Sequence, residues 1–479
     1  MLEVKNLSVT FPEGTAVDNI SFSMEKGEIL AIIGESGSGK SMTSLSIAGL
    51  LPHDAAVSGE IVFEGRELLT MSAKERRGIQ GKDISMVFQE PMTSLNPVMK
   101  IGKQVEEVLV LHTELGREER KQRVLEALTA AGLADPERLY HAYPHQLSGG
   151  MRQRVMIAMA TVLQPRLMIA DEPTTALDKK IQGQILSLLK QINKDRQMGI
   201  LFISHNLEVV RDFCDRILVM YRGKLVESGT PEEIFHNPKE DYTKKLLASI
   251  PDGKRSEGAE TGNRKPVLEV KSLNVYYPEK RKQKKQVIFD ASFTIYEREM
   301  VGLVGESGGG KSSLSKAILG LNKHIEGTII HHTEYPQMVF QDPYSSLNPA
   351  KRIGWILEEP LRIQGKLDKK ERKEKVLHML ECVGLEPSYA QRRPRELSGG
   401  QRQRIAIALA LILESKFIIA DEPVSALDVT IQAQILELLK KLKEEFGLSY
   451  LFISHDMAVI NEMCDRVFRL RDGKLYEEL

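Results

Sequence analysis

The sequence predicts an α/β fold that is built twice, as two consecutive domains of the same kind. The 479 residues exceed the usual size of one domain and suffice for two. A long segment near residue 150 also returns near residue 400. Within each half, short apolar runs alternate with stretches of helical periodicity, a pattern typical of parallel strands joined by helices.

The repeat is clearest between Leu147–Asp178 and Leu397–Asp428, where 19 of 32 positions are identical at an offset of 250 without gaps. Each copy begins with Leu-Ser-Gly-Gly before a helix-compatible run, and a helix start suits a phosphate because its backbone N–H groups are unsatisfied. Each copy then enters a short apolar run that ends at Asp171 or Asp421, followed by Glu. Ligands of α/β sheets bind at the carboxyl ends of strands, so this arrangement predicts phosphate and Mg²⁺ chemistry.

Each half also contains a glycine-rich loop, GESGSGKS at Gly34–Ser41 and GESGGGKS at Gly305–Ser312. A strand is predicted before each loop and a helix after it, at Met42–Leu50 and Ser313–Leu321, which is the context of a P-loop. The glycines let backbone N–H groups surround phosphates, Lys reaches the outer phosphates and Ser ligates Mg²⁺. The predicted phosphate-binding residues are Gly34, Glu35, Ser36, Gly37, Ser38, Gly39, Lys40 and Ser41, and Gly305, Glu306, Ser307, Gly308, Gly309, Gly310, Lys311 and Ser312.

Composition excludes several other classes of protein. Lys plus Arg equals Asp plus Glu, at 66 each, so net charge does not indicate nucleic acid or membrane as a partner. We find no apolar run near the ~18 residues that a membrane helix needs, and no signal-peptide core at the N-terminus, so we expect a cytoplasmic chain. Three dispersed cysteines form neither a disulfide framework nor a metal motif. Cys214 and Cys464, 250 residues apart, are expected to be buried thiols in equivalent helices.

Leu-Ser-Gly-Gly followed by a strand ending in Asp-Glu-Pro closely resembles the signature and Walker B elements of ATP-binding cassette (ABC) ATPases. The resemblance implies two tandem P-loop domains, each with a RecA-like core, an antiparallel β lobe and an α-helical subdomain. It implies ATP and Mg²⁺ as cofactors. The amphipathic patterns at Glu118–Ala131 and Lys369–Val383 resemble the helical subdomain, whose groove receives a permease helix in the family.

The resemblance also implies roles for individual residues. The carboxylates after the Walker B aspartates orient or deprotonate the attacking water, the histidines of the two LFISH segments contact the γ-phosphate, and the glutamines of VFQEP and VFQDP reach Mg²⁺ and that water. These catalytic residues are Glu172, Glu422, His205, His455, Gln89 and Gln341. The Mg²⁺ ligands are Ser41, Gln89, Asp171, Ser312, Gln341 and Asp421. The histidines and glutamines also have a simpler interpretation, as structural polar residues.

Two further sets of residues complete the expected nucleotide sites. Phe11 and Tyr277 lie at one aligned position ahead of the glycine-rich loops, where an aromatic stacks on adenine in the family; the alternative is an ordinary aromatic at a strand end. The resemblance implies that the two cassettes pair head to tail around two ATP molecules, each contacted by the signature of the other half. The signature residues are Ser148, Gly149, Gly150, Ser398, Gly399 and Gly400.

The two halves differ in length at defined places. Lys40 to Gln89 spans 49 residues but Lys311 to Gln341 only 30, because the first half has an extra charged segment at about 64–82. The predicted domains are a first cassette at 1–235, an extension at 236–250, a flexible linker at 251–266 and a second cassette at 267–479. The second half stops short of the extension, and the basic run KRKQKK at 280–285 is interpreted as a solvated hairpin tip.

The spellings QEPMTSLNP…LSGGMRQR and QDPYSSLNP…LSGGQRQR, with the tail HNPKEDYTKKLL, resemble the two ATPases of dipeptide, oligopeptide and nickel importers, fused as in glutathione-type importers. The resemblance implies a peripheral protein at the cytoplasmic face of the inner membrane. Its partners would be two integral-membrane permeases and, indirectly, an extracytoplasmic binding protein, with no nucleic acid. Met151 replaces Gln in the first signature, which we do not interpret as a loss of function. Residues 215–381 contain no Cys for an iron–sulfur centre.

Other functions fit the sequence less well. In a sugar-importer ATPase, the sequence motif of one phosphate loop is usually incomplete and this tail is missing. A twin-cassette factor acting on ribosomes has a long, charged, helical linker. A DNA-repair ATPase needs zinc-binding cysteines. Peptides, glutathione, nickel and metallophores remain open as the transported solute, because the ATPase does not touch it.

Overall fold

The computed structural model describes residues 1–88, 94–174, 177, 179–250, 253, 264–278, 284–306, 308–425 and 427–478. The chain forms two compact units, Met1–Ile250 and Pro251–Leu479. The finer division of the first unit at residue 235 stays a prediction, and most of the predicted linker, like residues 280–283 of the basic run, lies outside the described residues.

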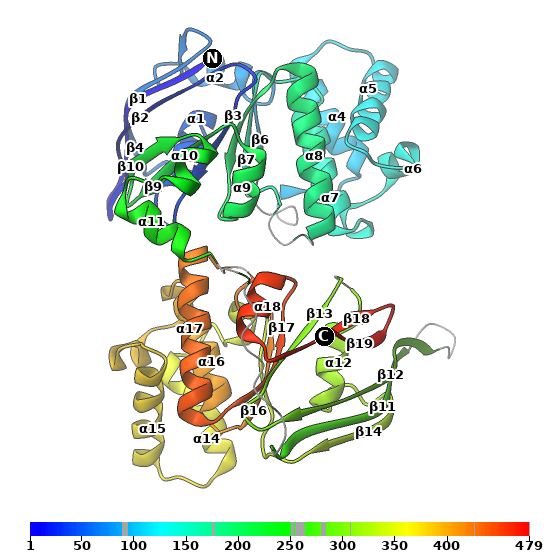
Figure 1. Cartoon of the computed structure of the whole chain (residues 1–479). Coiled ribbons are helices and arrows are strands. Elements are labelled where there is room, and N and C mark those ends of the chain that lie inside the picture. The colour runs from blue at the N-terminus through cyan, green and yellow to red at the C-terminus, as the bar shows by residue number, and fades with distance from the viewer. Residues whose placement is uncertain are drawn as a thin grey trace. The chain divides into compact units, whose positions relative to one another are not determined.

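The first unit has two sheets (Figure 1). An antiparallel lobe has the strand order β2-β1-β4-β5, and a six-stranded sheet has the order β10-β9-β3-β8-β7-β6, in which β10 alone is antiparallel to its neighbour. The strands of the two sheets are β1 (Leu2–Phe11), β2 (Gly14–Met24), β3 (Ile29–Ile33), β4 (Ala56–Phe63), β5 (Arg66–Glu67), β6 (Ile84–Val87), β7 (Leu167–Asp171), β8 (Gly199–Ile203), β9 (Arg216–Tyr221) and β10 (Lys224–Gly229).

Helices cover this sheet and form a separate subdomain beside it. Helix α7 packs against α4, α5 and α8, which agrees with the predicted helical subdomain. The helices are α1 (Lys40–Ala48), α2 (Ala73–Ile79), α4 (Ile101–His112), α5 (Arg117–Ala130), α6 (Pro136–His141), η1 (Pro144–Gln146), α7 (Gly149–Thr161), α8 (Lys179–Arg196), α9 (Leu207–Phe213), α10 (Pro231–His236) and α11 (Asp241–Ala248).

The second unit repeats this plan. Its antiparallel lobe has the order β12-β11-β14, and its large sheet, β15-β16-β17-β13-β18-β19, follows the same order as the first. The strands are β11 (Pro266–Pro278), β12 (Lys284–Tyr296), β13 (Met300–Gly305), β14 (Ile325–His331), β15 (Gln337–Val339), β16 (Phe417–Asp421), β17 (Ser449–Ile453), β18 (Arg466–Arg471) and β19 (Lys474–Glu478). The helices are α12 (Lys311–Ile318), α13 (Pro343–Ser346), α14 (Ile353–Gln364), α15 (Lys369–Cys382), η2 (Pro387–Gln391), η3 (Pro394–Glu396), α16 (Gly399–Leu411), α17 (Val429–Phe446) and α18 (Met457–Met463).

The central strands are short and apolar because both of their faces are buried. In β16, Phe417 and Ile419 enter the core between the sheet and the lobe, whereas Ile418 and Ala420 enter the core beneath the helical subdomain. Successive strand residues point to opposite faces, so each strand contributes to both cores. The strands and helices of both halves thus confirm the predicted α/β class.

The helices after the glycine-rich loops begin two residues earlier than predicted, at Lys40 and Lys311. In each case the preceding glycine has a left-handed backbone, with φ of 102° at Gly39 and 106° at Gly310, and the helix starts directly after it. Helix α1 also ends earlier than predicted because Gly49, at φ 67°, caps it. The left-handed region is favourable for glycine and costly for other residues.

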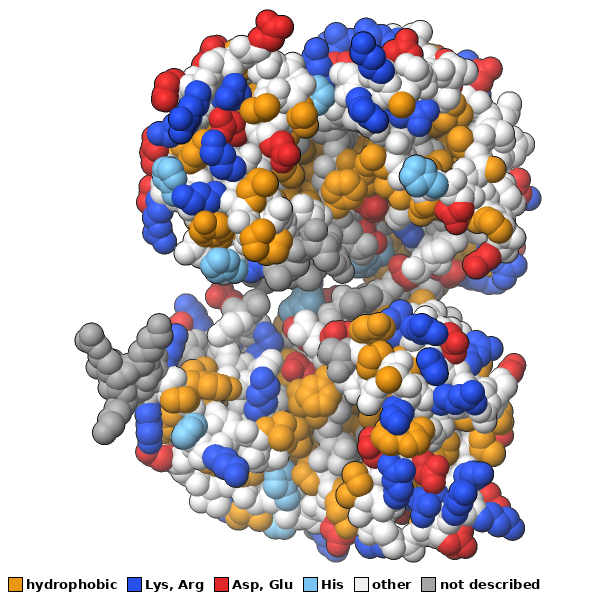
Figure 2. All heavy atoms as spheres, turned by 180° about the vertical axis from the view of Figure 1, so that it is seen from behind, with side chains coloured by type: hydrophobic (Ala, Val, Ile, Leu, Met, Phe, Trp, Pro, Cys, Tyr) orange, Lys and Arg blue, Asp and Glu red, His pale blue; other side chains and the backbone are white. Residues whose placement is uncertain are grey.

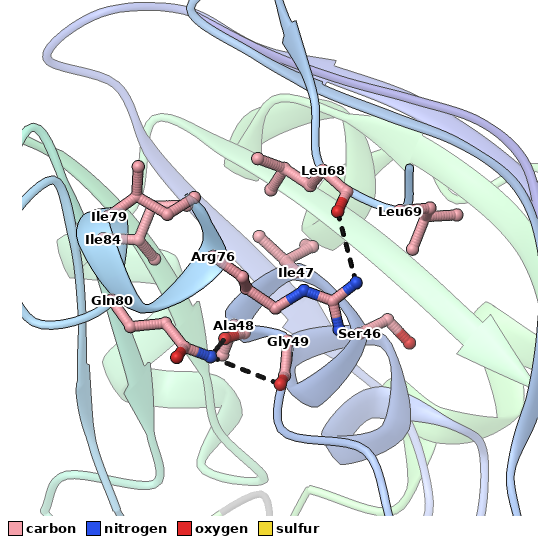
Figure 3. A pocket seen from close by; sticks show the side chains of 10 residues that line it. All are labelled: Ser46, Ile47, Ala48, Gly49, Leu68, Leu69, Arg76, Ile79, Gln80 and Ile84. Atoms are coloured by element: carbon pink, nitrogen blue, oxygen red, sulfur yellow. Dashed lines mark hydrogen bonds between the residues drawn. The ribbon is translucent and has the colours of Figure 1, made fainter. Parts of the chain in front are cut away.

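The extra segment of the first half forms β5 and α2. Helix α2 supports the end of α1, because Gln80 Nε2 donates hydrogen bonds to the carbonyls of Ala48 at 2.8 Å and Gly49 at 3.3 Å. Figure 3 shows the narrow pocket between these elements, where the Arg76 guanidinium also reaches the Leu68 carbonyl. In the second unit a ring nitrogen of His331, Nε2, is hydrogen-bonded to the Ile318 carbonyl of α12 at 2.8 Å. In the second half, which lacks this extra segment, strand β14 therefore supports α12, the helix that follows the glycine-rich loop.

No helix in the described ranges is both long and apolar enough to span a membrane. The predicted amphipathic helices are confirmed as α5 and α15 within one residue at each end. Cys214 and Cys464 are buried free thiols at the ends of α9 and α18, also as predicted. Burial, with a smaller contribution from a neighbouring aspartate, raises the pKa of both thiols far above the ordinary cysteine value.

We therefore predict one reactive thiol in the native chain. Cys382 is only partly buried, whereas Cys214 and Cys464 are 7% and 1% exposed. A thiol reagent such as DTNB should modify about one cysteine quickly, and the other two only when the protein unfolds. The substitution Cys382→Ser should remove the fast phase; a fast phase that persists in this variant would contradict the assignment.

Candidate functional site

The first glycine-rich loop joins the end of β3 to the start of α1. Gly34, at φ 147°, lies so close to the chain that a Cβ there would be 2.1 Å from the Met220 carbonyl oxygen. A Cβ on Gly39 would be 2.6 Å from the carbonyl oxygen of Ala16 in β2. Ser36, Gly37 and Ser41 are exposed on the open side of the loop. The loop is therefore packed between two strands and open where the helix begins, which is the geometry of an anion site.

Lys40 is 94% buried within this loop, since its relative exposure is 6%. Its Nζ donates to the carbonyls of Gly34 and Glu35, both at 2.7 Å. Lys311 repeats this contact, with Nζ 2.7 Å from the Gly305 carbonyl and 3.1 Å from that of Glu306. The loop carbonyls thus hold each ammonium group at the phosphate loop, and its contact with the outer phosphates stays a prediction.

The two Walker-type carboxylates follow the buried strands β7 and β16. The backbone N–H of Glu172 donates to the Ile203 carbonyl at 2.9 Å, and that of Glu422 donates to Ile453 at 2.9 Å. Both glutamates have φ of 48°, a left-handed conformation that is uncommon for residues other than glycine. The chain turns sharply there, so each Asp–Glu pair lies at the carboxyl edge of its sheet, beside the β8 or β17 histidine.

Each glutamate contacts the histidine of the LFISH segment in its own unit. Glu172 Oε2 lies 3.1 Å from His205 Nδ1, and Glu422 Oε2 lies 3.4 Å from His455 Nδ1. In the second unit Gln341 Nε2 also donates to Glu422 Oε2 at 2.9 Å. The structure therefore brings glutamine, glutamate and histidine together there. The corresponding Gln89 of the first unit lies outside the described residues, as does Ser307 of the second loop.

The surroundings of the carboxylates raise the pKa values of the two aspartates and lower that of Glu422. Burial, reinforced by the charge of Glu172, raises the pKa of Asp171 to about 6, while Ser41 and Lys40 oppose the shift. Burial and the charge of Glu422 likewise raise the pKa of Asp421. Burial also disfavours ionised Glu422, but the hydrogen bond and positive charge of His455 outweigh it and lower the pKa of this carboxyl. A cation beside the aspartates would offset the cost of their ionisation.

The donors beside Asp421 suit Mg²⁺. Ser312 Oγ donates to Asp421 Oδ2 at 3.3 Å, so a hydroxyl and a carboxylate oxygen already face each other. Mg²⁺ prefers oxygen ligands and usually takes only one or two carboxylates from the protein, with water and substrate phosphates completing its shell. Among the described residues no group of three or more His, Cys, Asp or Glu could hold a metal alone. With a serine hydroxyl and an aspartate oxygen side by side, the site fits an Mg²⁺ ion that is bound together with a phosphate.

The signature residues lie at the start of the helical subdomain's long helices. Ser148 caps α7 and Ser398 caps α16, each hydroxyl accepting from the N–H three residues later at 3.3 Å. Gln401 also accepts from the Ser398 N–H at 3.0 Å, which Met151 cannot do. The Met151 helix is nevertheless capped, so the substitution leaves the helix start intact. Within each unit the remaining signature residues are helical glycines, Gly149, Gly150, Gly399 and Gly400.

The predicted adenine-stacking residues lie on the antiparallel lobes. Phe11 ends β1, pairs with Gly14 of β2 and is partly buried against the core. Tyr277 lies near the end of β11, pairs with Lys285 and packs against the corresponding core. Strand β2 contacts the first phosphate loop at Gly39, so the Phe11 hairpin borders that loop. Their contact with adenine stays a prediction.

Comparisons with known proteins identify the family. The family model for ABC transporters matches residues 17–175 and 288–425, once in each unit. Over this whole chain, the peptidoglycan transport ATP-binding protein YejF of Agrobacterium fabrum is 44% identical, and 92% of its length is covered. A YejF protein of Escherichia coli described as an uncharacterised ABC transporter ATP-binding protein is 45% identical, with 95% covered. The glutathione import ATP-binding protein GsiA of E. coli is 43% identical, with 86% covered.

This chain belongs to the ABC transporter ATP-binding proteins. It is an ABC ATPase with two cassettes in one chain, and it binds ATP. Both glycine-rich loops and both Asp–Glu pairs lie within the matched ranges. The membership of the ABC family that the sequence predicts is therefore confirmed. The roles of the individual site residues remain predictions.

Two further groups contact the first phosphate loop, and the sequence alone does not predict either of them. The N–H of Gly223, in the turn after β9, donates to the Ser38 carbonyl at 3.0 Å. The hydroxyl of Tyr242, in the extension, accepts from the Glu35 N–H at 3.1 Å. In the sequence, the tail indicates only a resemblance to importer ATPases. The single available signal was an aromatic residue in an otherwise polar segment.

We predict a pH-dependent contribution of His455 to stability. Its hydrogen bond to Glu422 raises the pKa of His455 above its ordinary value, although burial opposes this shift. A raised folded-state pKa means that the stabilisation is fully present below the unfolded value of about 6.5 and is lost as the pH rises through the folded value. Without nucleotide and in EDTA, His455→Gln should lower the melting temperature by about 1 to 3 °C more at pH 6 than at pH 8.5. An equal loss at both pH values would contradict this interpretation.

Proposed function

We propose that this ABC ATPase energises the import of peptides or peptide-derived solutes through separate membrane permeases. The observation that carries the proposal is the likeness over the whole chain, including both cassettes, to proteins named for glutathione import and for peptidoglycan transport. Glutathione is a tripeptide and peptidoglycan contains short peptides, so a peptide-containing solute is the chemistry that these names share. Import, rather than export, is taken from the GsiA name and from the spelling of the motifs.

The proposed chemistry places one ATP and one Mg²⁺ at each phosphate loop. Bound Mg²⁺ would neutralise phosphate charge, held by the serine hydroxyl and Walker aspartate of each unit, together with the glutamine Gln341 in the second. Lys40 and Lys311 would contact the outer phosphates. Glu172 and Glu422 would orient the attacking water or accept its proton, and His205 and His455 would hold these carboxylates in position. Pairing of the two cassettes around the nucleotides stays a prediction.

The partners that we propose are two integral-membrane permeases, which this chain would bind at the cytoplasmic face of the membrane. An extracytoplasmic binding protein would act indirectly, through these permeases. Apolar side chains lie exposed among charged ones on the face of each unit seen in Figure 2. On the helical subdomains, Leu111 of α4 is 73% exposed and Ile363 of α14 is 80% exposed. These two side chains are therefore the positions at which we propose to test a contact with the permeases.

We predict that both sites hydrolyse ATP. The two units have equivalent Lys, Ser, Asp, Glu and His residues, so Glu172→Gln and Glu422→Gln should each reduce steady-state hydrolysis. The double variant should lose about 10²- to 10⁴-fold, the usual contribution of a general base. Each variant should still bind ATP, since the phosphate loop is unchanged. Glu126→Gln, an exposed residue of α5, is the matched control. Unchanged hydrolysis in Glu172→Gln would show that the first site does not contribute.

The transporter role can be tested by purification of the tagged chain from its native cells in mild detergent. We expect mass spectrometry to find two polytopic membrane proteins with it, and less of both in a variant with charged residues at Leu111 and Ile363. The ligand of the associated binding protein would then identify the solute. Ribosomal proteins without any permease would contradict the proposal and would favour the translation-factor alternative.

A further inference from the structure

The C-terminal extension of the first unit contacts the phosphate loop directly. Helix α11 follows α10 along the chain (Figure 1), and it begins at Asp241. Its Tyr242 hydroxyl accepts a hydrogen bond from the Glu35 N–H at 3.1 Å. The two residues are separated by 207 positions in the sequence. A segment outside the matched cassette region thus reaches the phosphate loop.

The position of Tyr242 is determined by a second aromatic residue. Its ring stacks on Tyr221, the last residue of β9, with centroids 4.1 Å apart and planes at 26°. The Arg222 guanidinium lies 5.0 Å from the Tyr221 ring on the same turn. Stacked rings are worth more than their buried area alone and restrict each other's orientation. The phenol oxygen is therefore directed to the loop by the sheet and by its own helix.

The extension is also anchored independently of the loop. The backbone N–H groups of Lys239 and Glu240 donate to the Glu227 carboxylate of β10, at 2.8 and 3.2 Å. Thr243 and Leu246 of α11 are buried, at 0% and 3% exposure. These contacts hold the helix against the sheet on both sides of Tyr242, so the contact with Glu35 is part of a packed interface.

Tyr242 and Lys40 together hold the Gly34–Glu35 peptide unit, because its N–H donates to the Tyr242 hydroxyl and its carbonyl accepts from Lys40 Nζ at 2.7 Å. The Glu35 carbonyl accepts from Lys40 Nζ at 2.7 Å and from the Ser38 N–H at 3.1 Å, while the Glu35 N–H is directed to Tyr242. With both ends of this residue held, the following Ser36–Gly39 segment starts from a defined orientation. A site whose donors are already arranged loses less conformational entropy when a phosphate binds.

We propose that Tyr242 is a positioning residue for the first phosphate loop, and that docking of α11 and nucleotide binding at this loop strengthen each other. Coupling of this kind is reciprocal by thermodynamic necessity. The inference rests on the proposed assignment of Gly34–Ser41 to the nucleotide phosphates. The second unit has Arg471 at the position of Tyr221, with its side chain 80% exposed, so the aromatic platform belongs to the first loop.

The test uses the full chain with Lys311→Ala, so that nucleotide binding reports the first loop. Tyr242→Phe keeps the ring and its stacking on Tyr221 but removes the hydroxyl. We expect the Kd for Mg-ADP, measured by calorimetry, to rise about 3- to 10-fold, the usual effect of one lost hydrogen bond. Tyr140→Phe is the matched control, because it removes a buried hydroxyl that bonds Glu106 at 3.0 Å in the helical subdomain of the same unit. Its Kd should equal that of the parent.

Hydrogen exchange separates a positioning role from a merely structural one. In the parent, Mg-ADP should slow amide exchange in residues 241–248, and this protection should be reduced in Tyr242→Phe. A variant with a lower melting temperature but an unchanged Kd and unchanged protection would show that Tyr242 only stabilises the fold, and would overturn the proposal. Lys40→Ala tests whether Gly34–Ser41 binds the nucleotide phosphates, the assignment on which this proposal rests. If Lys40→Ala abolishes binding but Tyr242→Phe does not affect it, only the coupling fails; if Lys40→Ala binds normally, the proposed nucleotide site fails as well.

Discussion

The parallel arrangement of the central strands is the constraint on which each candidate site depends. Strands β3, β7 and β8 run in one direction, so their carboxyl ends meet at one edge of the sheet. The phosphate loop leaves β3, the Asp–Glu pair ends β7, and the histidine follows β8. Residues far apart in sequence are thereby brought within hydrogen-bond distance. The second unit has the same strand order and the same result with β13, β16 and β17.

The carboxylates at this edge are close to each other and buried, which makes charge the second constraint. Adjacent Asp and Glu side chains disfavour each other's ionisation, and burial adds to this effect at Asp171 and Asp421. A histidine stabilises the ionised form of the glutamate, as the lowered pKa of Glu422 shows. The aspartates instead have a serine and a lysine nearby. This division is consistent with a cation at the aspartate and a protonatable partner at the glutamate.

The two units share one architecture but support their phosphate loops differently. The first unit has α2 and Gln80 at the end of its loop helix, whereas the second has His331 from β14. The first unit also has the Tyr221–Tyr242 stack beside its loop, and the second has an exposed arginine at the position of Tyr221. The differences lie in peripheral elements, which tolerate change, and they leave the residues at the sheet edge equivalent.

Much of this protein could be predicted from its sequence, because the strongest signals are local. The glycine-rich loops, the apolar strands that end in Asp-Glu or Ser-His, and the amphipathic helices each depend on neighbouring residues, and each of these signals occurs in both halves of the chain. The class of fold, the family and the residues that meet at the sheet edge follow from these signals. Helix boundaries at Lys40 and Lys311 were misplaced because the preceding glycine conformations depend on close contacts with other strands. Only the tertiary structure revealed the contact between Tyr242 and Glu35, because no periodicity or spacing relates residues that are 207 positions apart.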